Sequence, residues 1–301
     1  MIARRQSWEK QIWVKTSITL IFLVLAVLAP SSLFGVESLF GDLQRRLVAD
    51  DVNPGLVEAI YGHSLIRLVP EVVAGNLKRS EKELNYEQFL SPSAVGKTRR
   101  YLERHRPALQ EAEQRFGVPP SVVVAILMVE TALGTYTGKY LTINVLSTMA
   151  VSEDPLVKER IFSYLSADER QVQSERTLAR LRKRAIRSYR ELKALFGYLS
   201  TTDTDPFRLR GSSEGAIGIP QFLPSNIDRY GRDGDGNNHI DLFDHRDAIA
   251  SVAFFLKAHH WKEAQSPREK KRVLLHYNRS RYYVDTVYAL AERLDQAQAE
   301  P

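Results

Sequence analysis

The chain has 301 residues, of which 44% are hydrophobic and 26% are charged, and its formal net charge is +6. This composition is ordinary for a globular protein and excludes an intrinsically disordered one. The complete absence of cysteine excludes disulfides, thiolate zinc sites, cysteine nucleophiles and the attachment of a lipid to an N-terminal cysteine.

The first 35 residues are typical of an export leader rather than of a folded domain. An uncharged apolar stretch, residues 18–29, follows four basic residues, Arg4, Arg5, Lys10 and Lys15. The stretch has the length of a signal-peptide core and, with its flanks, approaches that of an uncleaved membrane anchor. The basic flank predicts an exported protein, either periplasmic or tethered to the inner membrane. Without residues 1–35 the net charge falls to +3, which does not indicate a nucleic-acid partner.

From residue 36 onward the pattern is mainly helical, and no run of alternating residues supports a sheet. Helical spacing of apolar residues is found in four stretches, 93–117, 156–199, 247–261 and 284–294. The basic part of the second stretch, residues 176–193, is most simply a solvated helix face, with contact to a polyanionic substrate as the lesser alternative. Residues 200–226 are rich in Gly, Pro and Ser and predict a long loop, which in a compact domain is usually functional.

Residues 119–135, PPSVVVAILMVETALGT, predict a buried central helix that ends in a carboxylate. Three successive valines would also suit a strand, but Pro119 and Pro120 in the first turn and Gly134 after the end favour a helix. Glu130 then lies near the helix C-terminus, where burial and the helix dipole both raise its pKa. A carboxylic acid that stays protonated can cleave a glycosidic bond by general-acid catalysis. Considered alone, however, the residue favours a structural role, in solvent or in an ion pair.

The segment 211–215, GSSEG, matches a nucleophile elbow with Ser213 as the nucleophile, but no buried strand precedes it, so we reject the match. The histidines fit no metal-binding pattern.

Residues 276–290 place tyrosines and an asparagine at a loop-to-helix junction, namely Tyr277, Asn278, Tyr282 and Tyr283. Sugar binding and aromatic core packing explain these residues equally well.

Residues 233–247, DGDGNNHIDLFDHRD, predict an EF-hand-like calcium loop that acts as a structural clip. Asp233, Asp235 and Asn237 fall at ligand positions 1, 3 and 5, and the His239 carbonyl falls at position 7. Position 12 is Asp244 instead of the usual glutamate, so Asp247 could close an enlarged loop in its place. The alternative is an acidic turn without a metal, and we favour calcium.

Four motifs, in order, resemble the membrane-bound lytic murein transglycosylase B family, whose members cleave peptidoglycan and have a goose-lysozyme-like catalytic fold. They are AEQRFGVPPSVVVAILMVETALG, GSSEGAIGIPQFLPSN, DGDGNNHIDLFDHRDAIASVAFFLKAHHW and YNRSRYYVDTV. The resemblance covers residues 36–295 and implies a mainly α-helical chain with a helical N-terminal part at 36–117, a lysozyme-like core at 118–295 and a tail at 296–301.

Residue by residue, the resemblance implies that Glu130 is the single catalytic acid and base. It implies a substrate-binding set of Ser212, Gln221, Tyr277, Asn278 and Tyr283, and a calcium-binding set of Asp233, Asp235, Asn237, His239 and Asp247. The implied reaction cleaves the bond between N-acetylmuramic acid and N-acetylglucosamine and leaves a 1,6-anhydro product, with peptidoglycan strands as the partner.

The chain departs from the family pattern at Leu133, Glu214 and Pro220. Glu214 adds a second carboxylate, and hydrolytic glycosidases use two. A hydrolytic muramidase of the same fold is therefore one alternative, and a catalytically silent peptidoglycan-binding protein is another.

Overall fold

The computed structural model describes residues 39–78, 85–166 and 175–299. Contacts divide the chain into two units, residues 1–41 and 42–301, and the fold discussed below is that of the second. The predicted leader, residues 1–35, lies outside the described residues. No single described helix is long and apolar enough to cross a membrane, although one bent pair, Arg106–Phe116 with Pro120–Thr131, has the required length and composition.

Nearly all of the regular secondary structure in the described part of the chain is helical, which confirms the predicted mainly α fold. The α-helices are α2 (Gly41–Ala49), α3 (Pro54–Tyr61), α4 (Pro70–Lys78), α5 (Pro92–Arg104), α6 (Arg106–Phe116), α7 (Pro120–Thr131), α8 (Thr142–Ala150), α9 (Pro155–Ser163), α11 (Glu175–Thr201), α12 (Pro224–Tyr230), α13 (His245–Ala258), α14 (Pro267–Tyr277) and α15 (Arg281–Ala299). The remaining elements are the 3-10 helix η2 (Tyr86–Leu90) and the two-residue strands β1 (Tyr140–Leu141) and β2 (Arg210–Gly211).

Proline is the first residue of seven of these helices. The first helical position suits proline because its N–H would have no partner there and its φ angle is already helical. Side chains of Asn53, Ser91, Asp154 and Asp244 also accept hydrogen bonds from N–H groups of the first turns that follow them. These local signals explain why so many short helices begin where they do.

The stretch 93–117 is helical as predicted, but it forms two helices, a break that its apolar spacing does not indicate. α5 ends at Arg104 and α6 begins at Arg106, with His105 between them. Pro107 accounts for the break because it lacks the N–H of a continuing helix and its ring would collide with the carbonyl one turn earlier. The predicted stop is confirmed, since Gly117 has a left-handed φ of 69°.

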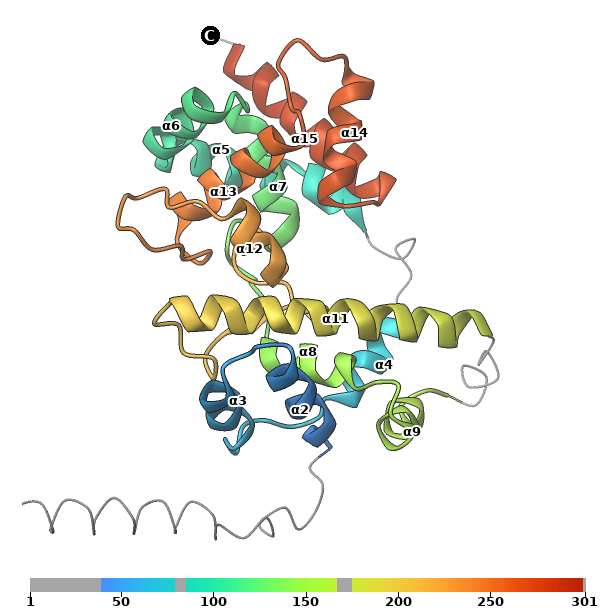
Figure 1. The fold of residues 1–301 in the computed structure, drawn as a ribbon. Helices are drawn as coiled ribbons and strands as arrows, with labels where there is room; N and C mark the ends of the chain where they lie inside the picture. The colour runs from blue at the N-terminus through green and yellow to red at the C-terminus, as the bar shows by residue number, and fades with distance from the viewer. Residues whose placement is uncertain (1–38, 79–84, 167–174, 300–301) are drawn as a thin grey trace, which may run out of the picture. The chain divides into compact units, whose positions relative to one another are not determined.

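α7 is the central buried helix that its sequence predicts. Every residue from Ser121 to Met128 is buried, and α7 packs against α5, α6, α13 and α15. Figure 1 shows α7 within the group formed by these helices, on the other side of α11 from α2, α3, α8 and α9. The helix therefore holds its last turn, which carries Glu130, against a well-packed core.

α11 joins the two groups of helices by packing against α8 and against α12 (Figure 1). Beside it, β1 and β2 pair antiparallel, with Tyr140 opposite Gly211. Gly138 is required here, because a Cβ atom at this position would lie 2.1 Å from the backbone of Gly211 and its φ is 112°. The predicted loop 200–226 is largely irregular, apart from the end of α11, β2 and the start of α12.

Candidate active site

Glu130 lies in the last turn of α7 and is half-buried. The helix ends directly after it because Ala132 and Leu133 both adopt left-handed backbone conformations, with φ angles of 48° and 62°. Residues with a Cβ adopt this conformation at some cost, which the surrounding packing must compensate. The helix end therefore places Glu130 at a sharp reversal of the chain, beside the loop that follows β2.

Burial raises the pKa of Glu130 from its ordinary value of 4.5 to about 7, and a hydrogen bond from Tyr283 opposes the rise. The hydroxyl of Tyr283 donates this bond to Oε1 of Glu130 over 2.7 Å. The position at the C-terminal end of α7 acts in the same direction as burial, because a helix C-terminus disfavours a negative charge. A carboxyl group with a pKa near neutrality can both donate and accept a proton, as acid–base catalysis requires.

Two tyrosines of the predicted set lie beside Glu130. The rings of Tyr277 and Tyr283 stack with their centroids 6.3 Å apart and their planes at 8°. The hydroxyl of Tyr277 donates a hydrogen bond of 2.6 Å to the carbonyl of Pro220. Asn278 follows α14, and its Oδ1 accepts a bond from the N–H of Ser280. This junction holds Tyr283, which is almost fully buried, against the carboxyl group.

The loop that contains Ser212 and Gln221 is fastened to the end of α7. Thr131, next to Glu130, donates a hydrogen bond of 2.9 Å from its hydroxyl to the carbonyl of Ile219. Gln221 has a φ of 52° and donates from Nε2 to the carbonyls of Thr137 and Gly218. These bonds hold residues 219–221 against the turn that follows Glu130.

Ser212 has a different place in the same loop, where it shapes the backbone. Its Oγ accepts hydrogen bonds from the N–H groups of Glu214 and Ala216, at 3.2 and 3.1 Å. Both bonds lie within the turn at residues 212–216, so the structure assigns the Ser212 side chain to the shape of this turn. Glu214, the additional carboxylate, forms an ion pair of 3.3 Å with Arg184 on α11.

Sequence reasoning did not identify Thr131 or the carbonyl groups of Ile219 and Pro220 as parts of the site. Thr131 bridges two chain segments, because its Oγ also accepts a bond from the N–H of Gly134. A threonine directly after a candidate acid was a weak signal in the sequence. A backbone carbonyl gives no sequence signal, so only the fold reveals the other two.

The acidic loop 233–247 is ordered by its own side chains. Asp233 accepts bonds of 2.7 Å from the N–H groups of Gly236 and Asn238, and Asn237 accepts one from the N–H of His239. Asn238 adopts a left-handed φ of 63°, a conformation that asparagine tolerates better than most residues do. The loop is thus folded back on Asp233, with backbone N–H groups turned inward.

Asp233, Asp235 and Asp247 bring carboxylate oxygens within 4.8 Å of one another. Asp247 is fully buried, and burial raises the pKa of its carboxyl group. No described lysine or arginine forms an ion pair with it. Asp244 has a different place, because its side chain caps α13 by accepting from the N–H groups of Arg246 and Asp247. Carboxylate oxygens are among the ligands that Ca²⁺ takes in proteins.

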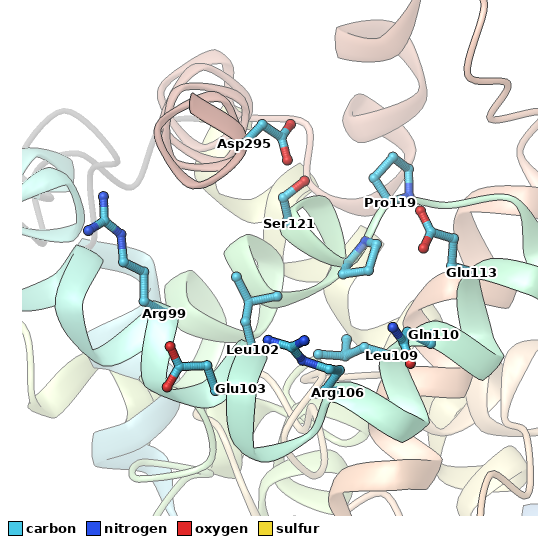
Figure 2. Close-up of a pocket in the computed structure, with 11 residues that line it drawn as sticks. Arg99, Leu102, Glu103, Arg106, Leu109, Gln110, Glu113, Pro119, Ser121 and Asp295 are labelled. Carbon is cyan, nitrogen blue, oxygen red and sulfur yellow. The ribbon is translucent and has the colours of Figure 1, made fainter. Parts of the chain in front are cut away.

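A cavity of about 580 Å³ lies at the opposite end of α7, and none of the predicted site residues lines it. Its wall includes charged side chains of α5, α6 and α15, shown with Ser121 in Figure 2. Ser121 is nine residues before Glu130, which the helical rise converts to roughly 14 Å. This cavity is therefore separate from the Glu130 cluster.

The fold is mainly helical and of the lysozyme-like class, and the end of its buried central helix presents a carboxyl group of raised pKa. The family model described as "Transglycosylase SLT domain" matches residues 35–270, and the chain belongs to this family. It is 32% identical over 175 residues to membrane-bound lytic murein transglycosylase B of Escherichia coli K12, an alignment that covers 58% of this chain. The same alignment covers 41% of that relative, so the chain matches less than half of its length.

Solved structures share the fold. Lytic transglycosylase Slt35 of Escherichia coli in complex with calcium matches with a TM-score of 0.67 at 22% identity, covering 85% of this chain and 94% of that one. SltB3 of Pseudomonas aeruginosa in complex with NAG-anhNAM-pentapeptide also matches with a TM-score of 0.67, at 20% identity, covering 84% and 78% of the two chains. At these identities the matches establish the lysozyme-like fold that the sequence predicts.

Proposed function

We propose that the chain is an exported peptidoglycan lytic transglycosylase, a lyase that acts on the bond between N-acetylmuramic acid and N-acetylglucosamine. The observation that carries the proposal is the half-buried Glu130, whose pKa of about 7 suits both directions of proton transfer. Membership of the transglycosylase family and the name of the curated relative support the same reaction.

In the proposed reaction, Glu130 gives its proton to the glycosidic oxygen as the bond from C1 of the muramic sugar breaks. The N-acetyl oxygen of that sugar stabilises the positive charge that develops at C1. The ionised Glu130 then removes the proton of the C6 hydroxyl, and O6 bonds to C1 in place of the acetyl oxygen. The sugar ends as a 1,6-anhydro ring, Glu130 is protonated again, and water is not consumed.

Neighbouring residues have distinct parts in this scheme. Tyr283 stabilises the ionised form of Glu130 between the two proton transfers, because it donates a hydrogen bond to the carboxylate. Ser212, Gln221, Tyr277 and Asn278 would hold the sugars, with Tyr277 and Gln221 kept in place by backbone carbonyls. A hydrolase would need a second carboxyl group, and Glu214 is instead engaged by Arg184.

The proposal includes a structural calcium ion held by Asp233, Asp235, Asn237, the carbonyl of His239 and Asp247. Three converging carboxylates, one of them buried without an ion-pair partner among the described residues, fit a divalent cation. The ion would join the loop to the start of α13, and no chemical step depends on it. Export to the periplasm and anchoring to the inner membrane stay predictions from residues 1–35.

Digestion of purified peptidoglycan, followed by mass measurement of the fragments, tests the proposal. We expect 1,6-anhydromuramic ends, which are lighter by one water than the reducing ends of a hydrolase. Glu130→Gln should lower the rate by orders of magnitude while the protein stays folded. Reducing ends in place of anhydro ends would support the muramidase, and unchanged behaviour of Glu130→Gln would support a catalytically silent binding protein.

A further inference from the structure

The positive charge of the protein is concentrated in one helix. α11 contains eight Lys and Arg residues and two Glu residues, a formal charge of +6 that equals the net charge of the whole chain. Outside α11 the chain has 34 basic and 34 acidic residues, which balance. A solvated helix usually mixes charges of both signs along its exposed face, so this helix is unusual within its own protein.

Four of these residues form an outer basic face on α11, namely Arg180, Lys183, Arg187 and Arg190. They recur at intervals of three and four residues, which places them on the same side of the helix. All four are exposed, while Leu181, Ala185, Ser188 and Leu192 bury the opposite side. None of the four forms an ion pair with an acidic side chain in the described part of the chain.

Three other basic residues of α11 are neutralised by acidic side chains. Arg182 pairs with Glu153, Arg184 with Glu214, and Lys193 with Asp50. The outer basic face lacks such partners and repeats like charges one turn apart, which disfavours a helix. A face that keeps this unfavourable pattern is suited to an anionic partner from outside the chain.

A residue beside the outer basic face, Arg184, contacts the loop of the candidate active site. Arg184 contacts Glu214 in that loop, and the same loop is bonded through Ile219 to Thr131, the residue after Glu130. Arg180 and Arg187 are one helical turn from Arg184 on either side, with Cβ atoms about 5–6 Å away. Nη1 of Arg184 is buried and has no acceptor among the described residues, so its charge is only partly compensated.

We propose that the outer basic face of α11 binds the carboxylates of the stem peptides on the glycan strand that Glu130 cleaves. The inference rests on the proposed function, since it concerns the substrate of the same site. Stem peptides carry free carboxylates, whereas the sugars at the scissile bond offer only neutral groups. From Arg180 to Arg190 the helix rises about 15 Å, which is long enough to meet more than one carboxylate.

Sedimentation with insoluble peptidoglycan sacculi tests the proposal, with the full chain carrying Glu130→Gln so that nothing is cleaved. The test variant adds glutamine at positions 180, 183, 187 and 190. The matched control instead adds glutamine for four exposed basic residues of α5, Lys97, Arg99, Arg100 and Arg104. Both variants lose four positive charges. Each is compared on native sacculi and on sacculi whose carboxylates have been converted to amides with carbodiimide and ammonia.

We expect the α11 variant to bind native sacculi about tenfold more weakly than the α5 control, as four exposed ion pairs of modest strength allow. On amidated sacculi the two variants should bind alike. Equal binding on native sacculi, or a difference that persists after amidation, would overturn the proposal. The same two variants are also sedimented with vesicles of anionic phospholipid. If the α11 variant bound only the vesicles more weakly than the control, the proposal would be overturned in favour of a membrane surface. Failure of the proposed function has a separate readout, the absence of anhydro ends from peptidoglycan digested by the unmodified chain.

Discussion

The hydroxyl of Tyr283 donates a hydrogen bond of 2.7 Å to Oε1 of Glu130, across 153 positions of the chain. The bond joins the start of α15 to the end of α7, two helices that also pack along each other. It stabilises the ionised carboxylate and so counteracts the effect of burial on the pKa of Glu130. The pair therefore sets the pH range in which Glu130 can act as both acid and base.

Tyr283→Phe should shift this range. Loss of the donated hydrogen bond raises the pKa of Glu130 further, so the protonated acid persists to higher pH. We expect the alkaline limb of the pH profile of kcat/KM, measured on soluble glycan strands, to shift to higher pH by roughly half to one unit. The maximum rate should be lower. Tyr282→Phe is a matched control, because Tyr282 is an exposed neighbour. A profile that falls in height without moving would contradict the assigned role of Tyr283.

Glu130→Gln should make the protein more stable at alkaline pH. The pKa of Glu130 is higher in the folded state, about 7 against an ordinary value of 4.5. Its protonation therefore stabilises the fold fully below about pH 4.5, and this contribution is lost as the pH rises through 7. The shift corresponds to at most about 3 kcal/mol.

Thermal melts at pH 4.5 and pH 8.5 measure this effect. The glutamine variant should match the unmodified protein at the lower pH and melt above it at the higher pH. Glu103→Gln, an exposed glutamate of α5, provides the control and should leave both melting temperatures unchanged. A glutamine variant that melts lower at pH 8.5 would mean that the ionised carboxylate stabilises the fold.

Calcium should raise the melting temperature of the protein relative to chelator, because an ion that binds only the folded state stabilises it. Asp247→Ala should abolish this difference. Asp244→Ala should lower the melting temperature with and without calcium, by the roughly 1 kcal/mol of a lost N-cap, and should keep the calcium-dependent difference. If Asp244→Ala removed the difference and Asp247→Ala did not, the ligand assignment would be reversed.

Local signals in the sequence were sufficient for the central helix and its carboxyl group. Prolines at the start of α7, an unbroken apolar run and the nearby Gly134 predicted a buried helix that ends at Glu130, and the structure confirms it. The same reasoning overlooked Pro107, which divides 93–117 into two helices, because the apolar spacing continues across the break. Periodicity reports which side of a helix is buried, and it is a poor guide to interruptions.

The contacts that assemble the site were beyond local patterns. The bond from Thr131 to Ile219 spans 88 positions and ends on a backbone carbonyl, which any residue possesses. The strands β1 and β2 have two residues each, too few to show an alternating pattern. Only the tertiary fold could show that Glu214 faces Arg184, a residue of the basic stretch 176–193.

Glu214 provides the last test, since it is the residue on which a hydrolytic mechanism would depend. Its carboxylate is 3.3 Å from the guanidinium of Arg184, and both side chains are about one-third exposed. Glu214→Gln removes a carboxylate but keeps the shape of the side chain, so we expect anhydro products and a rate within a few fold of the unmodified protein. The double variant, Arg184→Gln with Glu214→Gln, should behave like Glu214→Gln alone, because it removes the ion pair without leaving an unpaired charge. A loss of activity as large as that of Glu130→Gln, which the double substitution does not restore, would identify Glu214 as a second catalytic carboxylate.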